Sequence, residues 1–149
     1  MSSARKPLAA GDKVPDVRLP RLDGGERFLF SGSPVLLAFF KISCPTCQFT
    51  LPFLDRLHPN LAICAISQND AAATREFQQR FKLTLPFLLD PEADDFPASN
   101  AFGITVVPTM FTVGPDGRIG RVIEGWDRKE MDQLGALREG DNVPALKAG

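Results

Sequence analysis

The stretch Val35–Cys47, VLLAFFKISCPTC, decides the fold and the chemistry that we expect. Residues 35–40 are continuously apolar, which predicts a central strand buried on both faces. The helix-like run 48–57 follows, so Cys44 and Cys47 stand where a buried strand gives way to a helix. Free N–H groups and partial positive charge at the start of a helix favour a thiolate at Cys44. That thiolate can attack a disulfide, and Cys47, one turn later, can resolve the mixed disulfide.

The composition indicates one globular domain with its own hydrophobic core. The chain has 149 residues, of which 44% are hydrophobic, and a formal net charge of −1. This near-neutral balance, with the charges scattered, gives no electrostatic reason to expect a nucleic-acid or membrane partner. No apolar run approaches the roughly 20 residues that span a bilayer.

The compartment is inferred from the N-terminus and the cysteine count. Residues 1–10 lack the apolar core of a signal peptide, so we expect a cytoplasmic protein. Three cysteines, two of them in one short motif, are too few for a disulfide-stapled scaffold. The motif therefore indicates chemistry and not framework.

The rest of the chain predicts strands that alternate with helices. An N-terminal β-hairpin is expected at 14–20 and 26–30, around the turn signal Asp23-Gly24-Gly25. The elements expected after the motif are a buried strand at 61–66, a helix at 71–81 capped by Asn69 or Asp70, a short strand at 87–89, a short helix at 97–102 ended by Gly103, a β-hairpin at 109–113 and 118–123, and a last helix from Asp127 to about 138. This order predicts an α/β fold with a mixed central sheet flanked by helices on both faces. We expect a flexible arm at 1–10, a single domain at 11–140 and a frayed tail at 141–149.

Several other features of the chain, and their spacing from the two cysteines, resemble those of the thioredoxin superfamily. The chain is most similar to the branch that groups TlpA-like thiol–disulfide oxidoreductases with the AhpC-TSA family, and the resemblance covers residues 11–138. The features that carry it are the lead-in Gly11–Asp16, Pro52 in the helix after the motif, the loop Gly103–Thr109, the turn Pro115-Asp116-Gly117, and Gly125. The resemblance implies a thioredoxin-like fold with an N-terminal hairpin extension.

The resemblance also implies roles for individual residues. Cys44 is the attacking thiolate and Cys47 the buried resolving thiol. Pro108 is a cis-proline that faces them, which leaves the backbone of Val107 free to pair with an extended substrate segment. The other residues placed at the substrate are Pro45, Thr46, Gly125 and Trp126, although Trp126 can equally pack the last helix against the sheet.

The implied enzyme reduces or exchanges protein disulfides. Its partners are a disulfide-containing protein substrate and an upstream thiol or flavoprotein electron donor. We expect no metal and no cofactor other than the redox-active disulfide, and a monomer.

The chain departs from the family pattern at three positions. A buried acid often stands six residues before the first cysteine or three residues after the second, and these positions hold Ala38 and Thr50. The residue before Cys44, commonly tryptophan, is Ser43. The proton acceptor for Cys47 and the choice of partner are therefore left open.

Two other functions compete with disulfide exchange. A peroxiredoxin-like thiol peroxidase needs a threonine three residues before its reactive cysteine. That position is Lys41 for Cys44 and Cys44 for Cys47, so the threonine is missing in both cases. A redox-inactive, zinc-binding module would use these two cysteines with His58 and Cys64. Their spacing is poor, and Cys64 lies in an apolar strand, where we expect a core residue.

Overall fold

A five-stranded mixed sheet forms the centre of the computed structural model, which describes residues 7–58 and 61–135. Three neighbouring strands are parallel to one another. The fourth is antiparallel to its neighbour in this group, and the fifth is antiparallel to the fourth, which gives the mixed sheet that the sequence predicts. In spatial order the strands are β5 (Phe87–Leu89), β4 (Ile63–Ser67), β3 (Val35–Phe40), β6 (Thr109–Val113) and β7 (Ile119–Glu124).

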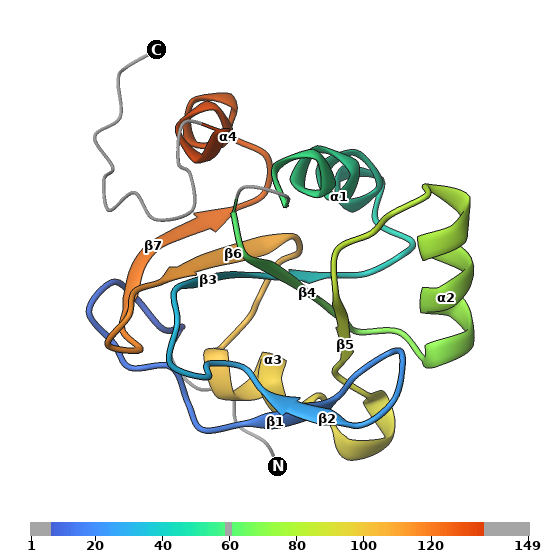
Figure 1. The fold of residues 1–149 in the computed structure, drawn as a ribbon, viewed down its shortest axis with the longest axis horizontal. Helices are drawn as coiled ribbons and strands as arrows, with labels where there is room; N and C mark the ends of the chain where they lie inside the picture. The colour runs from blue at the N-terminus through green and yellow to red at the C-terminus, as the bar shows by residue number, and fades with distance from the viewer. Residues whose placement is uncertain (1–6, 59–60, 136–149) are drawn as a thin grey trace.

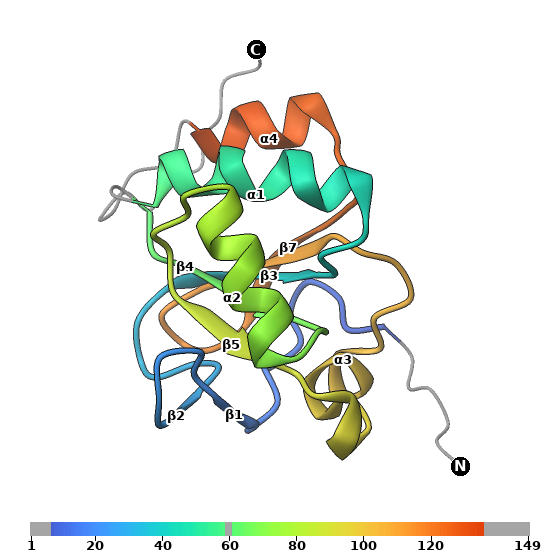
Figure 2. The same cartoon turned by 90° about the vertical axis from the view of Figure 1, so that its right-hand side faces the viewer.

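Helices cover both faces of this sheet, which explains why every residue of β4, and every residue of β3 after the first, is buried. One face carries α1 (Pro45–Leu57), α2 (Ala71–Arg80) and α4 (Arg128–Gly135), and the other carries the short helix α3 (Pro97–Phe102) (Figures 1 and 2). The expected thioredoxin-like α/β architecture is confirmed. A 3₁₀ turn before α3, η1 (Glu92–Asp94), was not predicted.

The N-terminal hairpin is present but shorter than predicted. Its strands, β1 (Arg18–Pro20) and β2 (Glu26–Phe28), form a separate antiparallel pair beside β5 (Figure 1). The backbone N–H of Leu22 donates to the carbonyl of Phe87 over 3.0 Å, which ties the hairpin to the edge of the main sheet. The first strand starts late because Val14 N–H instead donates to Gly117 O, 2.9 Å away in the turn before β7.

Local signals set the helix ends. Asp70 caps α2, and its Oδ1 accepts from Ala73 N–H at 2.8 Å. Gly103, with φ of 69°, ends α3 in the left-handed conformation that favours glycine. Asp127 Oδ1 accepts from Glu130 N–H at 3.1 Å at the start of α4.

The predicted ends of the chain fall largely outside the described residues. The expected end of the last helix near 138, the tail 141–149 and residues 1–6 of the arm all lie there. Within the arm, Leu8 N–H donates to Phe102 O at 3.0 Å, and the Leu8 side chain packs on the core of the α3 face. The domain boundaries stay a prediction.

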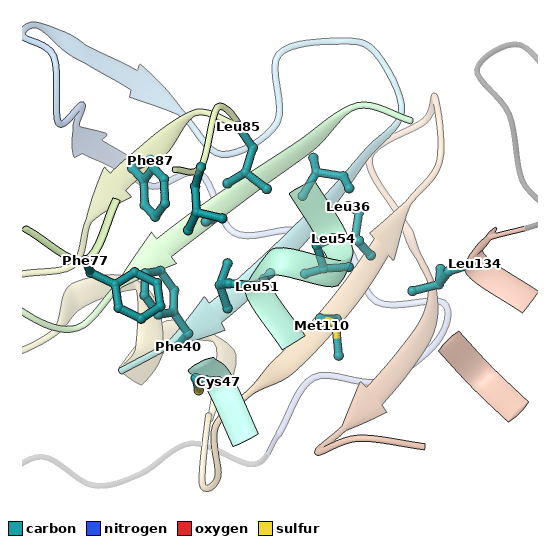
Figure 3. Close-up of a cluster of buried hydrophobic side chains, with 14 of the residues drawn as sticks. Leu36, Phe40, Cys47, Leu51, Leu54, Phe77, Leu85, Phe87, Met110 and Leu134 are labelled. Atoms are coloured by element: carbon teal, nitrogen blue, oxygen red, sulfur yellow. The ribbon is translucent and has the colours of Figure 1, made fainter. Parts of the chain in front are cut away.

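Each face of the sheet has its own apolar core. The core on the α1 face joins side chains of β3, α1 and α2, among them Phe40, Leu51 and Phe77, and Cys47 lies beside them (Figure 3). The core on the α3 face contains Cys64. Because side chains alternate across a strand, the sheet separates these two cysteines.

The helices of residues 7–58 and 61–135 include none with the length and apolarity that a bilayer span requires.

Candidate functional site

The loop between β3 and α1 is held by two polar side chains. Asn69 Oδ1 accepts from Ile42 N–H at 2.9 Å, and Gln48 Nε2 donates to Ile42 O at 2.9 Å. Both backbone polar groups of Ile42 are therefore fixed two residues before Cys44. The sequence analysis missed Asn69 and Gln48 in this role, since it treated Asn69 only as a possible helix cap.

Cys44 is the N-cap residue of α1 and is half-buried. Its extended backbone (φ −86°, ψ 120°) turns the sulfur back over the first turn of the helix. The backbone N–H of Cys47 donates to Cys44 Sγ at 3.3 Å. A thiolate accepts such a bond more strongly than a thiol does, and the helix dipole acts in the same direction.

Cys47 is fully buried, with 0% of its surface exposed. Burial is the largest cause that raises its pKa from 9.0 to about 12. The neighbouring Cys44 also raises the pKa, and the backbone hydrogen bond from Lys41 lowers it only in part. None of the three cysteines is in a disulfide.

The two positions where relatives often carry an acid are buried and uncharged. Ala38 is 0% exposed in β3. Thr50 is also 0% exposed, and its Oγ1 donates to Thr46 O at 2.7 Å, within its own helix. Neither side chain is a base that can take the proton of Cys47.

The loop before β6 lies against Cys44. The Val107–Pro108 peptide bond is cis, as the resemblance implied. The Cys44 thiol donates to Val107 O at a sulfur–oxygen distance of 3.7 Å. Pro108 is buried, and its carbonyl accepts from Gly125 N–H at 2.8 Å. The bonds therefore bring Cys44, Val107, Pro108 and Gly125 together.

Trp126 packs against α1. Its ring centroid lies 4.5 Å from that of Phe49 and 5.3 Å from that of Phe53, both in edge-on geometry. Phe49 is 59% exposed, and sequence reasoning missed it, although an aromatic residue two positions after Cys47 is a visible signal. Of the other predicted substrate residues, Pro45 is exposed and Thr46 half-buried in the first turn of α1.

The residues of the zinc alternative are not brought together. Cys64 is 0% exposed on the α3 face of the sheet, where burial raises its pKa to about 11. Cys47 is on the other face, and His58 caps the C-terminal end of α1, the end opposite the cysteines. Cys64 is thus the core residue that the sequence predicts.

A mixed sheet, a CxxC motif at the start of a helix and a cis-proline loop beside it define a thioredoxin-fold redox protein. The chain belongs to the AhpC/TSA family, whose model matches residues 10–122.

Relatives and solved structures agree with this assignment. The thiol-disulfide oxidoreductase ResA of Geobacillus thermodenitrificans is 30% identical over 131 residues, which cover 83% of this chain and 74% of ResA. The ResA of Bacillus subtilis is 21% identical over 149 residues, covering 93% and 82%.

Two solved structures share the fold. The putative thiol:disulfide interchange protein DsbE of Chlorobium tepidum superposes with a TM-score of 0.75 at 21% identity, covering 85% of this chain and 93% of DsbE. A peroxiredoxin-like protein from Aquifex aeolicus gives a TM-score of 0.72 at 12% identity, covering 88% of each chain. The predicted thioredoxin-like thiol–disulfide oxidoreductase is confirmed.

The predicted cytoplasmic location is wrong. ResA-type relatives and the neighbours DsbE and StoA are of membrane-anchored or extracytoplasmic types, and another neighbour is described as a secreted disulfide oxidoreductase. The prediction was based on residues 1–10, which lack the apolar core of a signal peptide. The fold and the thiol pair are the same in either compartment and give no information on location. The prediction therefore depended on residues 1–10 alone, and these were no guide.

Proposed function

We propose that Cys44 and Cys47 carry the exchange, with Cys44 attacking and Cys47 resolving. The Cys44 thiolate attacks one sulfur of a partner's disulfide, the partner's S–S bond breaks, and the partner's other sulfur leaves as a thiolate that takes up a proton. Cys47 then loses its proton and attacks Cys44 Sγ, which releases the partner's second thiol. The partner gains two electrons and two protons, and the enzyme is left with a Cys44–Cys47 disulfide.

The observation that carries this proposal is the contrast between the two sulfurs. Cys44 Sγ is half-buried at the start of α1 and accepts the Cys47 N–H over 3.3 Å, whereas Cys47 is fully buried. An outside disulfide therefore reaches Cys44 first. Cys47 acts only on a sulfur already bound to Cys44.

We propose that the substrate segment lies along the backbone of Val107. It lies between two loops, one with Pro108 and one with Gly125, that are hydrogen-bonded to each other. Among the described residues, the only hydrogen bond to the backbone of Val107 is the one from the Cys44 thiol. A partner's backbone can therefore pair with Val107 while its sulfur is at Cys44. We propose that Pro45, Thr46 and Trp126 form the surface beside this position.

Turnover requires two further features. An upstream thiol or flavoprotein donor returns two electrons to the Cys44–Cys47 disulfide, and no other cofactor takes part. The enzyme works as a monomer, an expectation supported by the few large apolar side chains that the described residues expose. Size-exclusion chromatography with light scattering tests the oligomeric state.

Three single variants test the roles. Cys44→Ser should abolish the reduction of insulin disulfides, and Cys47→Ala should form stable mixed disulfides that reducing gels release. Cys64→Ala is the matched control, because it also removes a buried cysteine but on the α3 face, and it should keep full activity. Parental activity in the Cys44 variant would refute the proposal.

A further inference from the structure

Exposed apolar side chains gather beside the redox site. Among the described residues three large apolar side chains are clearly exposed: Phe28 (41%), Phe49 (59%) and Val106 (46%). Phe28 belongs to the distant hairpin. Phe49 follows Cys47 by two residues in α1, and Val106 immediately precedes the Val107 that contacts Cys44.

Phe49 is part of a continuous apolar strip on α1. Pro45, Phe49 and Phe53 are spaced four residues apart, so they lie along one side of the helix. Trp126 contacts the rings of both Phe49 and Phe53. We call these four residues the apolar strip; it begins next to Cys44 and runs two turns along the helix.

The spacing of the strip matches that of an extended peptide. Four residues of helix rise about 6 Å. Two residues of an extended strand rise about 6.6 Å, and alternate side chains of a strand point to the same side. A peptide whose cysteine is at Cys44 therefore brings its second and fourth residues level with Phe49 and Phe53.

We propose that the apolar strip and Val106 bind an extended segment of the partner, with apolar side chains two and four residues from the partner's reactive cysteine. This inference rests on the proposed function, since the strip is continuous with the position where the partner's sulfur reacts. Compact proteins bury such segments, so the strip selects partners that are unfolded or extended around their disulfide. Trp126 holds Phe49 in place, and the partner covers the ring's exposed part.

A pair of peptides tests the strip. Each has one cysteine, linked as a mixed disulfide to thionitrobenzoate, and carries either phenylalanine or serine at the second and fourth residues from the cysteine. Versions with these residues on the N-terminal and on the C-terminal side cover both chain directions. Attack by Cys44 on the peptide sulfur releases thionitrobenzoate, which is followed at 412 nm by stopped flow.

In one of the two directions the phenylalanine peptide should react about tenfold faster than the serine peptide, the gain expected from covering a half-exposed phenylalanine. Phe49→Ser should remove most of this preference, and Phe49→Leu should restore much of it. Phe28→Ser, which removes an exposed phenylalanine from the hairpin, should leave it unchanged. Dithionitrobenzoate carries no peptide, so its rate with each protein is the reference by which that protein's peptide rates are divided.

Equal rates for the two peptides in both directions would overturn the inference, as would equal effects of the Phe49 and Phe28 substitutions. Either result leaves the proposed function intact, provided that dithionitrobenzoate is still reduced in a Cys44-dependent way. Thermal melts of the Phe49 variants check that the fold is retained.

Discussion

Resolution by Cys47 should be slow at neutral pH and should accelerate steeply as the pH rises. With a pKa of about 12, roughly one Cys47 in 30,000 is ionised at pH 7.5, against about one in 30 for a thiol with the ordinary value of 9.0. The population of the attacking thiolate is thus lower by about a thousandfold. Burial is the largest cause of the raised pKa, so we expect the shift to persist when Cys44 is in a mixed disulfide.

Nucleophilicity offsets part of this loss. A more basic thiolate attacks faster, with a Brønsted coefficient of about 0.4–0.5, so a shift of three pKa units returns about 15- to 30-fold. The net expectation is resolution about 30- to 60-fold slower than with an unperturbed thiol. Because the ionised fraction grows tenfold per pH unit well below the pKa, so should the rate.

Stopped-flow reaction with excess dithionitrobenzoate separates the two steps. Attack by Cys44 releases a first thionitrobenzoate at a rate that depends on reagent concentration. Resolution by Cys47 releases a second thionitrobenzoate at a rate that is independent of reagent concentration. The second rate should rise about tenfold per unit between pH 6.5 and 9.5 without levelling off. Cys47→Ala should show the first phase alone, whereas Cys64→Ala should show both.

A second phase that reaches a plateau at or below pH 9 would refute the reasoning. It would mean that Cys47 ionises as an ordinary thiol, or that another group takes its proton.

Three further predictions concern stability, each measured by urea unfolding. Burial raises the pKa of Cys64 from 9.0 to about 11, so the folded state holds this proton more tightly and its contribution to stability, complete below pH 9, is lost as the pH rises through 11. At pH 10 the loss is about 1 kcal/mol. The Cys64→Ala variant should therefore lose about 1 kcal/mol less stability than the parent protein between pH 7.5 and 10, and equal losses would contradict the assignment. The chain has no tyrosine, so no phenol group titrates in the same pH range as Cys64. Asp90→Ala should destabilise the fold by about 2–4 kcal/mol, because the buried carboxylate accepts from the N–H groups of Ala98 (2.7 Å) and Ser99 (2.8 Å) at the start of α3; a change under about 0.5 kcal/mol would show that water replaces it. Asp70→Ala should cost about 1 kcal/mol through the lost cap of α2, and no change would mean that the cap bond is not formed in solution.

Much of the fold follows from short-range patterns in the sequence. The continuous apolar run 35–40 is β3, and Pro97 and Gly103 bracket α3 as predicted, because these signals act within one element. The hairpin was predicted too long because its first strand competes with a bond between Val14 and Gly117, about a hundred residues apart. Local pattern carries no information on such a pairing.

The distinction between local sequence patterns and contacts between distant residues also separates the site residues that were predicted from those that were not. Cys44, Cys47 and the cis Pro108 belong to motifs with fixed spacing, and the structure brings them together. Asn69 follows β4 and Gln48 lies in α1, and only the parallel pairing of β3 with β4 brings Asn69 to the loop before Cys44. Their role depends on tertiary structure.

In the proposed mechanism, slow resolution and the apolar strip act on the same step of the reaction. Once Cys44 has attacked, the mixed disulfide either returns, when the partner's freed thiol attacks it, or proceeds through Cys47. If Cys47 were fast, every attack would lead to product, and only contacts formed during attack would discriminate between partners. Because Cys47 is held back by burial, the mixed disulfide has time to equilibrate with the free partner, and all the contacts that stabilise it count toward kcat/KM. The buried Cys47 thiol, with no acid at Ala38 or Thr50 to take its proton, should therefore increase the influence of exposed Phe49 on which partner is reduced.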